Sequence, residues 1–165
     1  MKYVDEFEQR IPRDEVEQLE TIVFDEIKKI DQNIIAKTCG SYRRGAKSSG
    51  DIDILLTHPT YKPPKDSNPL LDQIVSALTK KKFLTDHISN GAVKYMGVCQ
   101  LPSSISPNPH LHRRIDLCYI SIEKYWCGNY FFLMIKKIIV VSFKFPTGLL
   151  YFTGSDYFNT QMRYS

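Results

Sequence analysis

Two aspartates that stand two positions apart are the residues of this sequence best suited to chemistry. Asp51 and Asp53 lie in a strand-like run that also holds Ile52 and Ile54. Because side chains alternate along a β-strand, both carboxylates are expected on one face and both isoleucines in a core. Such carboxylates suit two divalent ions about 3.5–4 Å apart, one activating a hydroxyl group and the other holding a triphosphate. The predicted ions are two Mg²⁺, with Mn²⁺ as a substitute, because both prefer oxygen ligands.

The segment just before these aspartates has the composition of a phosphate-binding loop. Gly40 and Ser41 follow a short apolar run and open a predicted turn, where backbone N–H groups and hydroxyls can face a triphosphate. Arg44 supplies a guanidinium group for charge-assisted hydrogen bonds. An isolated Asp-x-Asp is more often a solvent-facing pair of acids, but the Gly-Ser and basic loop beside it favour a metal site. Asp116, in a second alternating run, is the candidate third carboxylate, and we expect the two runs to lie side by side.

Composition sets few limits on function. The chain has 165 residues, of which 42% are hydrophobic and 24% charged, and a net charge of +4. This balance is ordinary for one packed domain, and it is compatible with a nucleic-acid partner without requiring one. The cysteines form no Cys-x-x-Cys pair, which favours reduced thiols in an intracellular protein, and we expect no secretory leader. His110 and His112 have no accompanying cluster that would indicate zinc.

Two helices and four strands are predicted to position the acids. The first helix begins near Pro12, and its apolar side chains recur at helical spacing: Val16, Leu19, Val23, Ile27 and Ile30. The second is capped by Ser67 or Asn68, has Pro69 in its first turn, and buries Leu70, Leu71, Ile74, Val75 and Leu78. Strands are expected at 34–39, 51–57, 93–101 and 114–120, and the proline-rich stretch 58–69 is expected to be an exposed connection. The predicted fold class is α/β (α+β), a mixed sheet packed by helices.

Four blocks, in this order, make the sequence recognisable: Cys39 to Pro59, Tyr95 to Pro102, Arg113 to Asp116, and Tyr151 to Asn159. The chain resembles the family X DNA polymerases, the DNA polymerase beta group of the nucleotidyltransferase superfamily. The resemblance implies a nucleotidyltransferase palm that adds deoxynucleotides to a primer 3′-hydroxyl by a two-metal mechanism, in gap filling during base excision repair. The implied partners are primer-template or gapped DNA, deoxynucleoside triphosphates and repair proteins, with no membrane, and the implied location is the nucleus.

The resemblance also assigns roles to single residues. Asp51, Asp53 and Asp116 match the catalytic metal ligands, and Asp116 also matches the acceptor of the primer hydroxyl proton. The residues that match nucleotide-binding positions are Gly40, Ser41, Arg44, Ser49, Gly50, Tyr151, Phe152, Gly154, Asp156 and Asn159. The residues that match DNA-binding positions are Lys94, Arg114 and Arg163. At Cys118 the family carries an arginine that engages a catalytic aspartate, so this chain departs from the pattern there.

Three predicted regions divide the chain. Residues 1–128 resemble the palm, residues 129–149 form an atypical apolar insertion, and residues 150–165 resemble the start of the subdomain that binds the nascent base pair. The insertion is interpreted as translated intron sequence, a gene-model error or a lineage-specific strand pair. We expect the chain to lack the lyase domain of the family and to complete little of the closing subdomain. The alternative function is therefore a non-catalytic DNA-binding or non-functional fragment.

Overall fold

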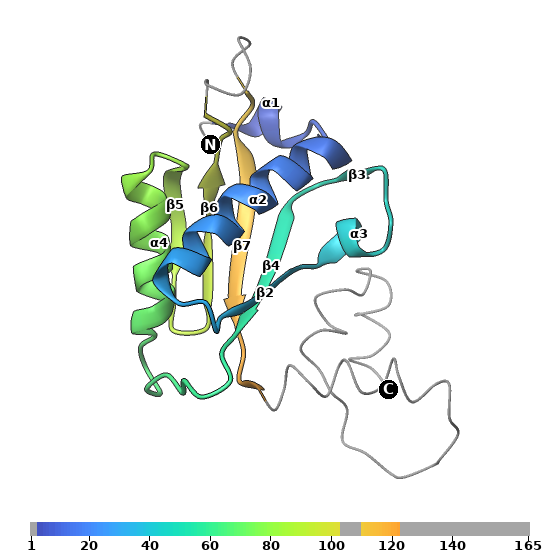
Figure 1. Ribbon diagram of the computed structural model, residues 1–165. Helices are drawn as coiled ribbons and strands as arrows, with labels where there is room; N and C mark the ends of the chain where they lie inside the picture. The colour runs from blue at the N-terminus through green and yellow to red at the C-terminus, as the bar shows by residue number, and fades with distance from the viewer. Residues whose placement is uncertain (1–2, 103–109, 123–165) are drawn as a thin grey trace, which may run out of the picture.

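The computed structural model describes residues 3–102 and 110–122, which form a mixed sheet with helices on one face (Figure 1). The sheet has five strands in the order β2-β4-β7-β6-β5. The pair β4 and β7 is parallel, and the other neighbouring pairs are antiparallel. The sheet strands are β2 (Ile35–Thr38), β4 (Ile52–Thr57), β5 (Leu84–Asn90), β6 (Lys94–Cys99) and β7 (Arg113–Tyr119). The predicted mixed α/β fold class is confirmed.

The long helix α2 (Arg13–Ile30) is the first predicted helix. Pro12 precedes its first turn and Asp14 and Glu15 lie within that turn, where acidic side chains favour the helix dipole. The predicted apolar stripe is buried, since Val16, Leu19, Val23 and Ile27 are at most 1% exposed and Ile30 packs against them. The helix is therefore fixed to the sheet along its whole length.

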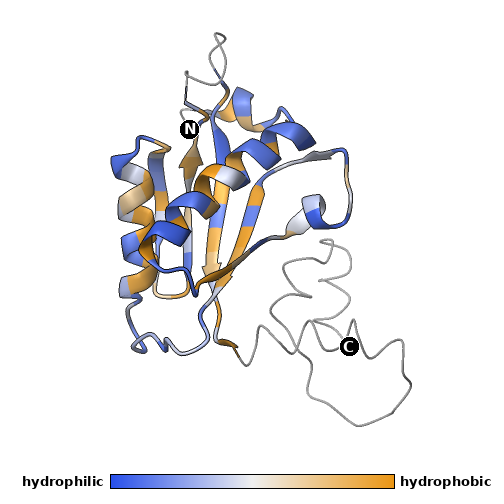
Figure 2. Cartoon of the chain, in the orientation of Figure 1, coloured by the Kyte–Doolittle hydropathy of each residue, from blue (hydrophilic) through white to orange (hydrophobic). Residues whose placement is uncertain are grey.

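The second predicted helix, α4 (Pro69–Lys80), begins where the sequence indicates. Of the two predicted caps, Asn68 is the one used: its Oδ1 accepts a hydrogen bond from Leu71 N at 3.2 Å. All five predicted apolar residues of this helix are buried in the same core as α2. In Figure 2 the hydrophobic side of α4 faces the sheet, as an amphipathic helix requires.

The strand β5 is an edge strand that the sequence did not predict. Only Leu84 of its seven residues is buried, and its pairing with β6 shifts register twice. Exposed, irregular edge strands lack the regular apolar alternation on which the prediction depends. Short elements were missed for the same lack of periodicity: α1 (Val4–Phe7), β1 (Ile11–Pro12), α3 (Gly40–Arg43) and β3 (Ser48–Ser49).

Tyr95 packs over the backbone of Gly97 on the core side of β6, and this close contact leaves no room for a larger residue at position 97. Tyr95 is fully buried, and its hydroxyl lies 2.8 Å from His87 Nδ1. A Cβ at position 97 would meet the Tyr95 hydroxyl and come within 2.6 Å of ring carbon Cζ. Gly97→Ala should therefore lower the free energy of unfolding by about 1–3 kcal/mol, as measured by urea denaturation. The same change at exposed Gly91, where the nearest atom would be 3.4 Å away, is the control and should cost clearly less.

The insertion, the candidate closing subdomain and Cys127 lie outside the described residues. The same is true of the predicted site residues Tyr151, Phe152, Gly154, Asp156, Asn159 and Arg163. Among the described residues, no helix is long and apolar enough to cross a membrane.

Candidate active site

The two predicted carboxylate strands lie side by side at the centre of the sheet. The strands β4 and β7 pair in parallel with Asp53 directly opposite Asp116. Asp51 immediately precedes β4. The alternating neighbours Ile52 and Ile54 are at most 1% exposed and belong to the helix-covered core. The prediction that the acids share the opposite face is confirmed, because strand alternation places them on the face that the helices leave open.

Asp53 is partly buried beside two other carboxylates. Burial, and after it the charges of Asp51 and Asp116, raise the pKa of Asp53 to about 7. Lys94 and Arg114 act in the opposite direction but do not compensate. A buried group of like charges is stabilised by additional positive charge, which is the condition a metal site provides.

Two cations of the chain pair with the outer acids. Lys94 Nζ lies 2.7 Å from Asp116 Oδ2, and Arg114 Nη2 lies 3.0 Å from Asp51 Oδ2. Asp116 is 4% exposed, and its other oxygen, Oδ1, is buried without a hydrogen-bond partner. An unpaired buried carboxylate oxygen costs free energy, so Asp116 retains capacity for a further donor or cation.

The three acids fit magnesium in their chemistry, although their side chains point to different partners. Their oxygens are the ligands that Mg²⁺ and Mn²⁺ prefer. Within residues 3–102 and 110–122, no three His, Cys, Asp or Glu side chains converge closely enough to hold a metal ion. Asp116 is paired with Lys94, and Asp51 with Arg114. A divalent ion would bind these carboxylates by replacing the two ion pairs.

Gly40 brings the predicted phosphate loop against the acids. Its φ is +57°, in the left-handed region, and a Cβ there would collide with Asp53 Oδ2. The backbone beside it is fixed as well, because Cys39 N donates to Asp53 O at 2.8 Å. Only glycine combines this backbone conformation with so close an approach to the carboxylate, so the loop and the acids form one site.

The hydroxyls of the loop face each other across a turn. Ser41 Oγ donates to Ser49 Oγ at 2.8 Å, and Ser49 is 1% exposed. Arg44 and Gly50 are exposed on the same loop. The turn between them uses Gly45 at φ +83°, and the predicted turn at Gly40–Ser41 is the single helical turn α3. The loop therefore presents hydroxyls and a cationic side chain next to the acids.

Comparison with known proteins agrees with this geometry. Residues 10–122 match the family model described as DNA polymerase beta palm, which is more than half of the chain. The chain belongs to the DNA polymerase beta palm family. It is 34% identical to DNA polymerase lambda of Rattus norvegicus over 169 residues, covering 99% of this chain and 25% of that protein. It is 30% identical to DNA polymerase lambda of Arabidopsis thaliana over 145 residues, covering 78% of this chain and 26% of that protein.

The chain thus spans about a quarter of the length of these two relatives. The predicted resemblance is confirmed, and both relatives carry the name of a DNA polymerase. Within the palm, the structure brings together six predicted site residues: Gly40, Ser41, Ser49, Asp51, Asp53 and Asp116. Lys94 and Arg114, predicted to bind DNA, lie at the same site and pair with its acids.

Position 118, where the resemblance predicts an arginine, carries a cysteine in this chain. Cys118 is 4% exposed, and burial raises the pKa of its thiol to about 12, so it is an inert thiol in an apolar group with Cys39 and Leu55. Lys94 pairs with Cys118 in the β6–β7 register, and its amine reaches Asp116 from there. Sequence spacing within one strand could not reveal this contact, because it depends on the register of two strands.

Two arginines of the palm that the sequence did not single out contact the phosphate loop. Arg10 donates to Ser48 Oγ and Ser48 O, and Arg13 donates to Tyr42 O and Ala46 O. Both flank Pro12 at the start of α2. Two basic residues around a helix start are the only local signal that could have found them, and it is weak.

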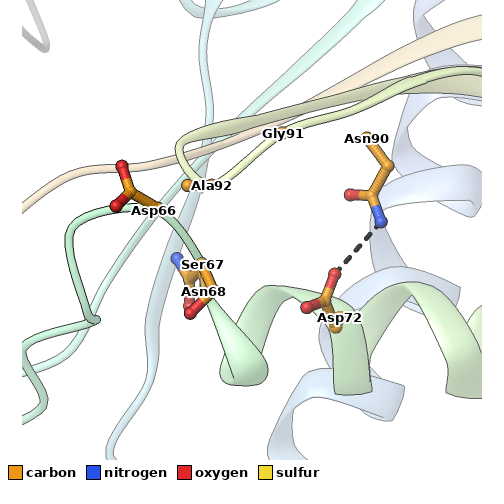
Figure 3. Close-up of a pocket in the computed structure, with 7 residues that line it drawn as sticks. All are labelled: Asp66, Ser67, Asn68, Asp72, Asn90, Gly91 and Ala92. Atoms are coloured by element: carbon orange, nitrogen blue, oxygen red, sulfur yellow. Dashed lines mark hydrogen bonds between the residues drawn. The ribbon is translucent and has the colours of Figure 1, made fainter.

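A cavity of about 210 Å³ lies elsewhere on the palm, between the start of α4 and the β5–β6 turn (Figure 3). Its lining is polar and includes Asp66, Asn68, Asp72 and Asn90, with Asn90 Nδ2 donating to Asp72 Oδ1 at 3.1 Å. None of the loop or acid-site residues lines it. Its two aspartates, Asp66 and Asp72, do not suit a triphosphate.

Proposed function

We propose that this chain is the palm of a DNA-directed DNA polymerase of the repair type. The observation that carries the proposal is the contact of the Gly40 backbone with Asp53, whose carboxylate lies opposite Asp116 on the neighbouring strand. A loop that suits phosphates and a set of carboxylates that suits divalent ions are thereby joined in one site. Nucleotidyl transfer needs both features together.

The three aspartates Asp51, Asp53 and Asp116 would hold two Mg²⁺ ions, and Mn²⁺ could replace them. Bound at this site, the ions supply positive charge for the reacting phosphate and leaving group. Asp116 Oδ1, which has no hydrogen-bond partner, would accept the proton of the primer 3′-hydroxyl. The deprotonated 3′-oxygen of the primer would then attack the α-phosphorus of a deoxynucleoside triphosphate, and pyrophosphate would leave.

The loop would hold the triphosphate. Ser41 and Ser49 offer hydroxyls, Gly50 offers a backbone without a side chain, and Arg44 offers a guanidinium group for the leaving phosphates. Most of the catalytic effect in phosphoryl transfer comes from such positioning and charge stabilisation. In this proposal the loop binds the nucleotide, and the acids activate the chemistry.

Arg114 and Lys94 are proposed to bind DNA phosphates once the ions have replaced them on the carboxylates. The C-terminal residues Tyr151, Phe152, Gly154, Asp156, Asn159 and Arg163 are proposed to contact the nucleotide and the template strand. Gapped DNA as substrate, base excision repair as pathway, repair proteins as partners and the nucleus as location complete the proposal. The names of the two relatives support the polymerase activity alone.

The test is single-nucleotide addition to a gapped DNA duplex by the purified chain, with Mg²⁺ and the complementary deoxynucleotide. We expect template-directed addition that requires Mg²⁺ and that falls by at least about 100-fold in Asp116→Asn. Asp72→Asn, an exposed aspartate at the distant cavity, is the matched control and should leave the rate unchanged. Salt-dependent DNA binding without any addition would instead support the non-catalytic alternative.

A further inference from the structure

Arg13, the first residue of α2, lies outside the acid site but forms hydrogen bonds to the predicted phosphate loop, residues 40–49. We propose that Arg13 is a positioning residue that holds the loop in the shape needed to bind a nucleoside triphosphate. The inference rests on the proposed function, because it concerns the triphosphate site of the same palm. The argument uses three sets of contacts between the start of α2 and residues 40–49.

The first set is made by the guanidinium group. Arg13 Nη1 donates to Tyr42 O at 2.9 Å and approaches Ala46 O at 3.4 Å. The Tyr42 carbonyl also accepts from Gly45 N at 3.0 Å, so the arginine joins a turn that the backbone has already closed. One side chain thus connects the two ends of the turn at residues 42–46. Gly45 within the turn adopts φ +83° without steric cost, but its backbone is too free to hold that shape by itself.

The second set fixes the direction of the guanidinium. Its Cζ lies 4.0 Å from the centroid of the Tyr42 ring, a cation–π geometry, and the ring packs against the helix-covered core. The Arg13 pair with Glu17, at 3.4 Å, is between half-exposed side chains and contributes little. Tyr42 and the two carbonyls, rather than Glu17, determine where Arg13 points.

The third set joins the two backbones. Arg13 N donates to Lys47 O at 3.2 Å, and the residues before it pair with the loop as the strands β1 and β3, with Ile11 opposite Ser49. Ser49 is in turn hydrogen-bonded to Ser41. Ile11 and the apolar side of α2 are buried in the core. The hydroxyls of Ser41 and Ser49 are therefore held in place by the packed part of the palm.

Arg13 acts through the loop rather than on the phosphates. Its Nη1 donor is committed to loop carbonyls and its flat face to the Tyr42 ring. None of these contacts involves the three aspartates. A loop held in its bound shape loses less conformational entropy when a ligand binds, so the arginine should improve nucleotide affinity without changing metal affinity.

The experiment is isothermal titration of the full chain with dATP in the presence of Mg²⁺, and separately with Mn²⁺ alone. Arg13→Met should raise the Kd for dATP about 10-fold and leave the Kd for Mn²⁺ within about 2-fold. Arg13→Lys, which keeps the charge but loses the planar fork, should recover only part of the loss. Glu17→Gln is the matched control: it removes the exposed ion pair with Arg13 but keeps an oxygen that can accept from the Tyr42 hydroxyl, and it should bind dATP like the parent chain.

A double-mutant cycle and hydrogen exchange separate the loop effect from general destabilisation. Tyr42→Leu should weaken dATP binding by a similar factor, and the double variant should be no weaker than either single one. Amide exchange at residues 40–49 should accelerate in Arg13→Met while exchange in β4 and β7 stays unchanged. Equal dATP affinity for the parent and Arg13→Met overturns this inference, whereas a parent chain that binds Mn²⁺ but no dATP overturns the proposed function.

Discussion

Replacing Arg113 with methionine is expected to lower the free energy of unfolding by about 3–5 kcal/mol. Arg113, on β7, is 5% exposed and makes a two-point ion pair with Glu15 of α2: Nε to Oε1 at 2.7 Å and Nη2 to Oε2 at 2.8 Å. Its Nη1 donates to Gln9 O at 2.9 Å. The substitution would leave a largely buried carboxylate and a backbone carbonyl without their donor, which is the expensive way to break such a pair.

Urea denaturation at neutral pH measures this loss, and the next residue supplies the control. Arg114 projects to the opposite face, where its pair with Asp51 joins side chains that are 40% and 34% exposed. Arg114→Met should therefore cost no more than about 1 kcal/mol. Replacing both partners, in Arg113→Met with Glu15→Leu, should recover most of the stability because no charge is then left buried. Equal losses of unfolding free energy in Arg113→Met and Arg114→Met would contradict the view that the buried Arg113–Glu15 pair is the more important of the two.

The contrast between Arg113 and Arg114 shows where sequence reasoning reaches its limit. Adjacent arginines in one strand look alike in sequence, but alternation sends one into the core beside α2 and the other to the acid face. The alternation around Asp53 was predictable because Ile52 and Ile54 flank it on both sides. The partner of Arg113 was not, because Glu15 is 98 residues away and lies on a helix.

The same limit applies to the site itself. The sequence predicted that the two acid-bearing runs lie side by side, but the exact register of Asp53 opposite Asp116 comes from the structure. The contact of Lys94 with Asp116 was not predicted, because it depends on the register of β6 against β7. The hydrogen bonds of Arg13 to the loop were not predicted either. Their acceptors are backbone carbonyl groups, which every residue type has.

Asp53→Asn is expected to stabilise the protein at pH 8, in buffer containing a chelator, by about 2–4 kcal/mol. Burial and the carboxylates of Asp51 and Asp116 raise the pKa of Asp53 to about 7, above the value near 3.8 of an unfolded chain. Between these values the folded state binds more protons than the unfolded state, so stability falls as pH rises from about 4 to about 7 and then levels off. The neutral amide avoids this penalty, so the advantage of the variant should vanish near pH 4.

Urea denaturation at pH 4, 6 and 8 measures the effect, with Asp72→Asn as an exposed control that should show no comparable gain. A variant that is equally stable to the parent chain at every pH would contradict the strained state of Asp53.

If the acids form the metal site, Mg²⁺ should make the parent chain more stable than Asp53→Asn. An ion that binds only the folded state adds stability in proportion to the logarithm of its concentration over its Kd. The parent chain would gain this term because the ion neutralises the charge that burial makes costly, whereas Asp53→Asn would gain little, having lost both the charge and a ligand. Excess stability of the variant with chelator that shrinks or inverts with Mg²⁺ would link the strain to metal binding. Strain of this kind, kept at a cost in stability, is expected where carboxylates are held together for a function.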